Sequence, residues 1–230
     1  MKNLIMKKIV IKISGELLNS TDSLNQVIDQ IKTLQLKYKI GIVIGAGNIF
    51  RGNQDSKNFG LEAAIGDNAG MLATIINGLI LKSLLEKKGV NTKILSALPV
   101  PTITDSITQE KINSSLEKNK VIIFVGGTGN PFFTTDTNAI LRALQMKADF
   151  VLKGTKVAGV FDSDPIKNKD AKLLKTINYN DFLTKNLQVM DLTAITLAKK
   201  HNLQIKVFNI FKENSLIKVL EEKDFGTLIS

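Results

Sequence analysis

The stretch at residues 121–136, VIIFVGGTGNPFFTTD, constrains the fold of this chain more than any other. Its first five residues are apolar and mostly β-branched or aromatic, which predicts a buried strand. The glycines and Asn130-Pro131 that follow can neither continue that strand nor begin a helix. After Asp136 the apolar residues recur at helical spacing, at Ala139, Ile140, Ala143 and Leu144. A buried strand therefore leads through a glycine-rich loop into the N-terminus of a helix.

This strand–loop–helix unit is suited to binding phosphate. Glycines let backbone N–H groups approach a ligand without a Cβ in the way. The first N–H groups of a helix are unpaired and lie at the positive end of its dipole, where they attract anions. The alternative is that Thr135 or Asp136 serves only as the N-cap of the helix. An N-cap alone does not explain several glycines and a Phe-Phe pair in one loop.

The composition sets broad limits. With 230 residues, 43% of them hydrophobic, and no linker or composition shift, we expect one domain over residues 1–230. The absence of cysteine excludes disulfides, cysteine metal sites and thiol nucleophiles, and it fits a cytoplasmic location. Lysines interrupt the apolar N-terminal run, so we expect neither a signal peptide nor a segment long enough to span a membrane.

The net charge of +10 raises nucleic-acid binding as an alternative. However, the only arginines are Arg51 and Arg142, and arginine is the better reader of phosphates and bases. We therefore expect no nucleic-acid partner and attribute the charge to a general lysine bias. The single histidine, His201, lies beside two lysines near the end of a helical pattern, which favours a solvated helix C-terminus over a catalytic role.

Other predicted strands also end in polar, glycine-containing loops. Lys12 lies near the end of the strand predicted at 8–13, beside Gly15, and is either a solvated lysine or a lysine directed at phosphate. The strand predicted at 41–44 leads into GAGNIFRG, which contains Arg51. This segment is not a dinucleotide-binding fingerprint, because Phe50 stands where the third glycine would be.

Strands and helices alternate along the whole chain. We predict further strands at 92–95, 150–152, 205–210 and 226–229, and helices at 24–38, 65–88, 107–118, 191–201 and 215–222. Residues 53–60 are predicted to be a loop, and 181–186 are helical at most. The predicted fold class is α/β, with a mainly parallel sheet sandwiched between helices. Ligands bind such sheets at the carboxyl ends of the strands, where the glycine-containing loops lie.

Several carboxylates are candidate site residues, and most of them have two interpretations. Asp67 begins a long helical pattern, so it is either a favourable N-terminal charge or a ligand for a substrate hydroxyl. Asp162 and Asp164 could bind a metal, but their loop composition favours turn formation. Asp191 is the expected N-cap of the helix at 191–201. We assign no residue as a metal ligand.

Known phosphate-binding motifs narrow the classes of nucleotide-binding protein to which the chain could belong. No Walker A motif follows any of the glycine-containing loops, and the protein-kinase motifs are absent. The ordered motifs that are present are KISGE at 12–16, GAGNIFRG at 45–52, GDNAGMLAT at 66–74, TGNPFFTTD at 128–136, KGTKVAGVFDSDP at 153–165 and MDLTA at 190–194. Together they resemble the bacterial UMP kinases of the amino-acid kinase family over nearly the whole chain.

The resemblance implies transfer of the γ-phosphate of ATP to UMP, giving UDP and ADP for UTP and CTP supply, with Mg²⁺ as cofactor. It also implies a cytoplasmic homohexamer with feedback inhibition by UTP at the UMP site. Its implied catalytic residues are Lys12, Arg51, Asp136 and Asp191. Its implied ATP-binding residues are Lys12, Ile13, Ser14, Gly15, Gly47, Arg51, Thr155, Phe161 and Asp164. Its implied UMP-binding residues are Ala46, Asp67, Thr128, Gly129, Asn130, Pro131, Phe132, Phe133, Thr134 and Thr135.

Two positions depart from the family pattern. Ala46 stands where relatives often have glycine, and UMP binding survives this change unless φ is positive there. Residues 17–26 are short and lack the glycine of a segment linked to GTP activation in relatives, so we do not expect that activation. The alternatives are another kinase of the same family, a non-catalytic nucleotide- or oxyanion-binding protein, and a basic nucleic-acid-binding module.

Overall fold

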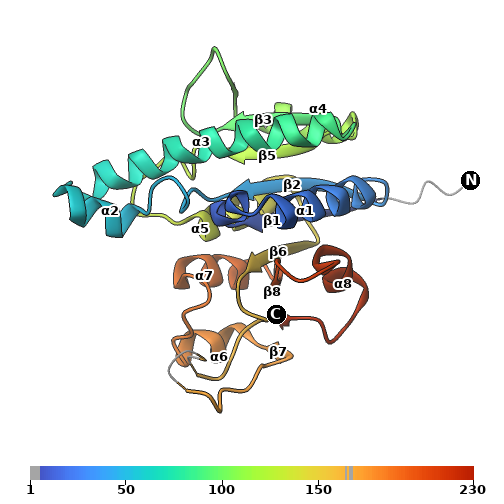
Figure 1. Cartoon of the computed structure of the whole chain (residues 1–230). Helices are drawn as coiled ribbons and strands as arrows, with labels where there is room; N and C mark the ends of the chain where they lie inside the picture. Colours follow the sequence, from blue (N-terminus) through green and yellow to red (C-terminus); the bar gives the residue numbers. More distant parts are fainter. Residues whose placement is uncertain (1–5, 164, 166–167) are drawn as a thin grey trace, which may run out of the picture.

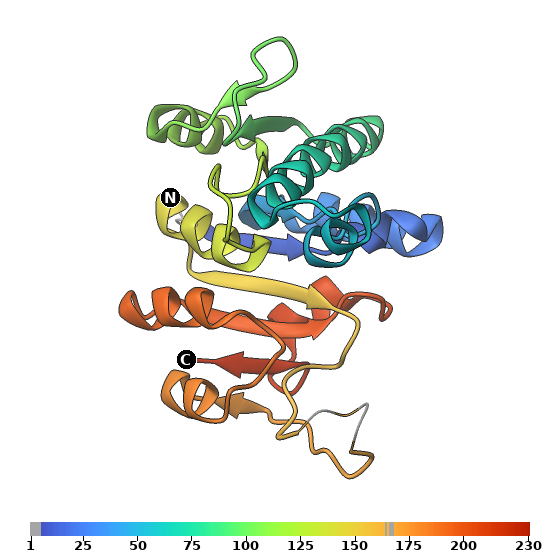
Figure 2. The same ribbon diagram turned by 90° about the vertical axis from the view of Figure 1, so that its left-hand side faces the viewer.

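A single sheet organises the chain. The computed structural model describes residues 6–163, 165 and 168–230, and in this part of the chain nine strands follow the order β4-β3-β5-β2-β1-β6-β8-β9-β7 (Figure 2). Among the paired strands of the described residues, only β8 and β9 run antiparallel to each other. The strands are β1 (Lys7–Ile13), β2 (Tyr38–Ile44), β3 (Thr92–Ser96), β4 (Asp105–Ser106), β5 (Val121–Val125), β6 (Phe150–Thr155), β7 (Thr176–Ile177), β8 (Gln204–Asn209) and β9 (Thr227–Ile229).

Helices cover both faces of this sheet (Figure 1). One core lies under α1 (Thr21–Leu34), α3 (Ala63–Lys87) and α8 (Ser215–Glu221). The second core lies under α4 (Gln109–Glu117), α5 (Thr135–Met146), α6 (Tyr179–Thr184) and α7 (Leu192–Lys200). The remaining helices are η1 (Gly15–Asn19), a 3₁₀ helix, and α2 (Gly52–Phe59). The predicted α/β class and mainly parallel sheet are confirmed.

Strand periodicity decides which side chains lie on the α5 side of the sheet at the carboxyl ends of the strands. Side chains alternate between the two faces of a strand. In β1, Ile9, Ile11 and Ile13 enter the core under α1, whereas Val10 enters the core under α5. Lys12 shares the parity of Val10, so it lies on the α5 side at the carboxyl end of the strand. The same alternation in β6 places Lys153 on the α5 side.

The prediction of a loop at residues 53–60 was wrong. The structure has helix α2 there, closed by Gly60 in the left-handed region at a φ of 65°. Its sequence, GNQDSKNF, is mostly polar and has no apolar stripe to indicate a helix. The two-residue strands β4 and β7 were also missed, because two residues carry no periodicity.

Helix α3 corrects the expectation that no segment is long enough to span a membrane. By length and composition alone this 25-residue helix could do so. In the fold it is a core helix on one side: Gly78 packs directly against Val125 and Ile94. Its other side leaves large apolar side chains in solvent, namely Ile65, Leu72, Ile76 and Ile80.

Candidate active site

Two lysines converge on one carboxylate at the carboxyl edge of the sheet. Lys12 and Lys153 are paired in register on the neighbouring strands β1 and β6. The Nζ of Lys12 lies 3.0 Å from Oδ1 of Asp136, and the Nζ of Lys153 donates to Oδ2 of the same residue. Asp136 lies in the first turn of α5 and is only 8% exposed. The arrangement is a buried carboxylate that holds two cations side by side.

The ionisation of this group follows from its surroundings. Burial alone would raise the pKa of Asp136, but the charges of Lys12 and Lys153 outweigh it and lower the pKa to about 2. Burial lowers the pKa of Lys153 to about 8, and the positive charge of Lys12 adds to this effect against the attraction of Asp136. Asp136 is therefore ionised at neutral pH, and Lys153 is a cation that titrates just above it.

Asp191 joins α7 to the N-terminus of α5. Its Oδ1 accepts from the Ala194 N–H at 2.7 Å, so the predicted N-cap is confirmed. The hydroxyls of Thr134 and Thr137 also donate to this carboxylate. The N-cap of α5 is Thr134, whose hydroxyl accepts from the N–H groups of Asp136 and Thr137. The alternative that made Thr135 or Asp136 a mere N-cap is therefore wrong, and the carboxylate of Asp136 is left for the lysines.

The loop after β5 has the backbone freedom that its glycines predict. Gly126, Gly127 and Gly129 all have positive φ, at 74°, 56° and 82°. Helix α3 fixes the start of this loop, because the Gly126 N–H donates to the buried hydroxyl of Thr74 at 2.8 Å. The glycines thus create a sharp turn at the end of the sheet without side chains to block it.

Asp67 is tied to the same loop. Its Oδ2 accepts from the Phe132 N–H at 2.7 Å, which joins α3 to the loop. Phe132 itself has a positive φ of 69°, an uncommon conformation for an aromatic residue. The Thr128 hydroxyl is bonded to the backbone of Asn130, so the loop is also braced internally. Phe132 and Phe133 are 73% and 49% exposed, so this loop presents two apolar rings to solvent.

The other loops named by the sequence lie at the neighbouring strand ends. The Ile13 carbonyl accepts from the Gly45 N–H at 2.9 Å, which joins the loops after β1 and β2. A Cβ on Gly15 would lie 2.5 Å from the Gly45 carbonyl oxygen, so only glycine fits there. Ser14 caps η1. Ala46 is buried and is not among the residues with positive φ. Alanine therefore fits the backbone at this position, where relatives often have glycine.

Arg51 faces a carboxylate that the sequence did not single out. Its Nη2 lies 2.5 Å from Oε1 of Glu16, and its Nε donates to the Gly47 carbonyl at 3.0 Å. Lys156, at the end of β6, contacts the other oxygen of Glu16 at 2.5 Å. The hydrogen bond from Lys156 and the charge of Arg51 lower the pKa of Glu16, despite partial burial. Glu16 thus connects the loops after β2 and β6 across the end of β1.

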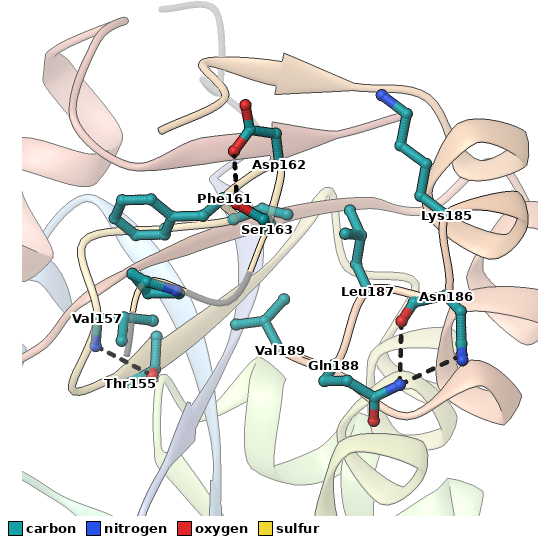
Figure 3. A pocket seen from close by; sticks show the side chains of 13 residues that line it. Thr155, Val157, Phe161, Asp162, Ser163, Lys185, Asn186, Leu187, Gln188 and Val189 are labelled. Carbon is teal, nitrogen blue, oxygen red and sulfur yellow. Dashed lines mark hydrogen bonds between the residues drawn. The ribbon is translucent and has the colours of Figure 1, made fainter. Parts of the chain in front are cut away.

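A cavity of about 490 Å³ lies beyond β6 (Figure 3). It is lined by Thr155 and Phe161, two of the three residues that the resemblance implies for the adenosine part of ATP, and by apolar residues such as Leu187 and Val189. The third assigned residue, Asp164, lies outside the described residues. The Oδ1 of Asp162 accepts from the Lys172 N–H at 2.9 Å, a contact between residues ten positions apart. The structure therefore brings Thr155 and Phe161 together at an apolar, ligand-sized cavity.

Sequence reasoning left out some residues of this site. The roles of Lys153 and Lys156 could not be separated by spacing, and Glu16 was only part of a motif. Lys153 could have been found from its position, because the side-chain alternation places it on the same face as Lys12 at the end of its strand. No cluster of three or more His, Cys, Asp or Glu side chains able to hold a metal occurs among the residues that the structure describes.

Comparisons with known proteins agree with this geometry. Residues 7–209 match the family model described as the amino acid kinase family. A uridylate kinase of Buchnera aphidicola subsp. Baizongia pistaciae is 45% identical over 236 residues, covering 99% of this chain and 97% of that protein.

Two solved structures are similar throughout. The UMP kinase of Ureaplasma parvum superposes with a TM-score of 0.93 at 41% identity, covering 99% of this chain and 100% of that one. The UMP kinase of Bacillus anthracis gives a TM-score of 0.92 at 35% identity, covering 97% and 96%. The resemblance drawn from the ordered motifs is confirmed.

Proposed function

The chain belongs to the amino acid kinase family, and we propose that it transfers the γ-phosphate of ATP to UMP, giving UDP and ADP. The observation that carries this proposal is the convergence of Lys12 and Lys153 on Asp136. In the strand order, these lysines stand between the glycine loop after β5 and the cavity after β6. An acceptor on the loop and ATP in the cavity would therefore meet at the lysines.

The chemistry asked of the protein is positioning and neutralisation of charge. Phosphoryl transfer develops negative charge on the oxygens of the transferred group, and fixed cations and backbone N–H groups stabilise it. In the proposed mechanism Lys12 and Lys153 neutralise the transferred group, and Asp136 keeps them side by side. Asp191 orients the N-terminus of α5 through Thr134 and Thr137. Arg51 contributes a further cation, and no histidine or cysteine is needed.

Each nucleotide has proposed contacts of its own. ATP phosphates would contact Ser14, Gly15 and Gly47, with adenosine against Thr155 and Phe161. UMP would contact Ala46, with its ribose at Asp67 and its phosphate on residues 128–135. The glycines with positive φ and the exposed residues 130 and 132–134 support this assignment, since the glycines carry no Cβ that would block a ligand from the backbone.

Mg²⁺ is part of this proposal and would supply neutralisation of the triphosphate charge. Magnesium usually binds through one or two carboxylates plus substrate phosphates. Oδ1 of Asp136 faces Lys12 at ion-pair distance but accepts no aligned hydrogen bond, so it has capacity for a further contact. The single available carboxylate oxygen fits an ion carried mainly by ATP rather than by a protein cage.

Self-association and feedback are further proposals. The apolar face of α3 supports a homo-oligomer, with a homohexamer proposed from the resemblance. Ile65, Leu72 and Ile76 are each at least half exposed on this helix, and a second copy of the chain would bury them. UTP is proposed to inhibit by occupying the UMP site, in a cytoplasmic enzyme.

The test is steady-state phosphate transfer from Mg-ATP, with UMP, CMP, dUMP, carbamate and aspartate as parallel acceptors. Rapid turnover confined to UMP supports the proposal. Turnover with carbamate or aspartate instead would assign the chain to another activity in the family. Nucleotide binding without transfer to any acceptor would make it a non-catalytic binding protein and overturn the proposal.

A further inference from the structure

Arg142 is a buried cation without an acidic partner. It lies in α5, is only 6% exposed, and packs its guanidinium over the ring of Phe124. Within the described part of the chain, no Asp or Glu forms an ion pair with it. Its partners are all neutral: Asn138 Oδ1 at 2.9 Å, Gln145 Oε1 at 2.6 Å and the Gly127 carbonyl at 3.5 Å. Burying an unpaired charge in this way is expensive.

The neighbouring amide adds a second uncompensated donor. The Nε of Arg142 is a donor, so the atom of Asn138 that faces it must be oxygen. This orientation leaves Nδ2 of Asn138 buried without a hydrogen-bond partner. Asn138 lies in the first turn of α5, where the helix dipole is also positive. The base of the loop after β5 therefore has an excess of positive charge and N–H donors.

An anion bound on this loop would offset that excess. Arg142 touches the loop at Gly127, directly before the residues 128–135 that we assign to the phosphate of UMP. Helix α3 holds the other side of the turn, through Thr74 and Gly126. A dianion on the loop would thus lie close to the buried charge without contacting it. Burial also lowers the pKa of Arg142 to about 10, which leaves it charged at neutral pH.

We propose that Arg142 is a positioning residue that acts through Gly127 and α5, and that its buried charge strengthens binding of the acceptor phosphate. This inference rests on the proposed function. It predicts an effect on UMP and not on ATP, because Arg142 contacts the loop after β5 and not the cavity after β6.

The test compares Arg142→Met, which removes the charge at similar volume, with Arg142→Lys, which keeps it. Lys206→Met is the matched control, since Lys206 is also partly buried, lies over the ring of Phe150 and bonds a carbonyl, that of Val219. Each protein is measured for dissociation constants of UMP and ATP by calorimetry, for steady-state KM and kcat, and for thermal unfolding.

Arg142→Met is expected to weaken UMP binding by about tenfold to a few hundredfold, the range expected when one charge acts from roughly 10 Å, at an effective dielectric of about 20, on a phosphate that carries one to two negative charges. ATP binding stays within about threefold, and Arg142→Lys and Lys206→Met stay close to the wild type for both nucleotides. Thermal stability of Arg142→Met is expected to change little, because removal of a costly buried charge opposes the loss of the hydrogen bonds to Asn138 and Gln145.

Three results would overturn the inference. One is unchanged UMP binding in Arg142→Met. Another is equal weakening for UMP and ATP together with loss of thermal stability, which is a purely structural role. The third is an Arg142→Lys variant as weak as Arg142→Met, which makes the hydrogen bonds and not the charge responsible. Failure of the wild-type protein itself to bind UMP would instead refute the proposed function.

Discussion

Lys12 and Lys153 stand opposite each other in register on adjacent parallel strands, and both of their Nζ atoms contact Asp136. The carboxylate offsets the repulsion between two cations that the sheet forces together. Neither lysine is free to turn away, because their side-chain exposures are 14% and 7%. The pair is therefore held in place before any anion arrives, which is the preorganisation that electrostatic catalysis requires.

Removing either lysine should affect turnover much more than binding of UMP. Lys12→Met and Lys153→Met are each expected to lower kcat about 10²–10³-fold, the effect of losing one preorganised charge-stabilising group. Steady-state kinetics with saturating ATP and UMP measure this. Lys39→Met is the control, because Lys39 lies near the amino end of β2, where it donates to the Leu116 carbonyl. This variant should keep normal turnover. A Lys153→Met enzyme with near-normal kcat would remove Lys153 from the site.

The pKa of Lys153 predicts opposite trends for activity and stability at alkaline pH. Its pKa is lowered from 10.5 to about 8, so the folded protein loses this proton before the unfolded chain does. The contribution of Lys153 to the free energy of unfolding therefore rises between about pH 8 and pH 10.5, where the unfolded state binds more protons. Over the same range kcat/KM should fall as the site loses a cation. Lys153→Arg should move the alkaline fall in kcat/KM to higher pH, and a fall that stays in place would contradict this assignment.

Replacing Asp136 should lower activity without unfolding α5. Asp136→Asn removes the charge that holds the lysines, while Thr134 still caps α5. We expect folded protein with kcat lowered about 10²-fold or more. Circular dichroism and kinetics on the same sample measure this. Stability from the ionised form is present above the unfolded pKa of 3.8 and is lost as pH falls through about 2, a window that the variant should lack. An unfolded variant whose residual folded fraction is fully active would mean that the role is structural.

Glycine at position 15 should be required for packing between loops. In Gly15→Ala the new Cβ would meet the Gly45 carbonyl oxygen at 2.5 Å, with the Asn48 side chain also in the way. We expect a loss of about 1–3 kcal/mol in the free energy of unfolding, typical of overpacking, and a raised KM for ATP. Gly70→Ala is the control, because no heavy atom lies within 4 Å of its added Cβ and it lies inside α3. The control should gain up to about 1 kcal/mol by chemical denaturation.

The apolar face of α3 should mediate self-association. Ile76→Asp places a charge among exposed apolar residues, and we expect it to dissociate the proposed oligomer into smaller species. Sedimentation velocity measures the change. Leu36→Asp is the matched control, since Leu36 is 78% exposed and lies outside this face. An Ile76→Asp protein that sediments as the wild type does would place the interface elsewhere.

Local pattern was enough for much of the fold. The alternation of Lys8–Ile13 predicted β1, and the glycines after Val125 predicted the loop that the structure has after β5. Both signals are short-range, because side-chain parity and the strand-breaking effect of glycine act within a few residues. Helix α2 was missed for the same reason, since its polar sequence lacks a periodic apolar stripe.

The sequence by itself determined where strands end, that glycine-rich loops follow them, and that Lys12 and Asp136 lie at such ends. Only the tertiary structure decided that β6 lies beside β1, in a register that sets Lys153 against Lys12 and both against Asp136. Lys12 and Lys153 are 141 positions apart, and strand order depends on long-range packing that no local pattern encodes. The same holds for Arg142, whose burial beneath the loop after β5 follows from how α5 packs on the sheet.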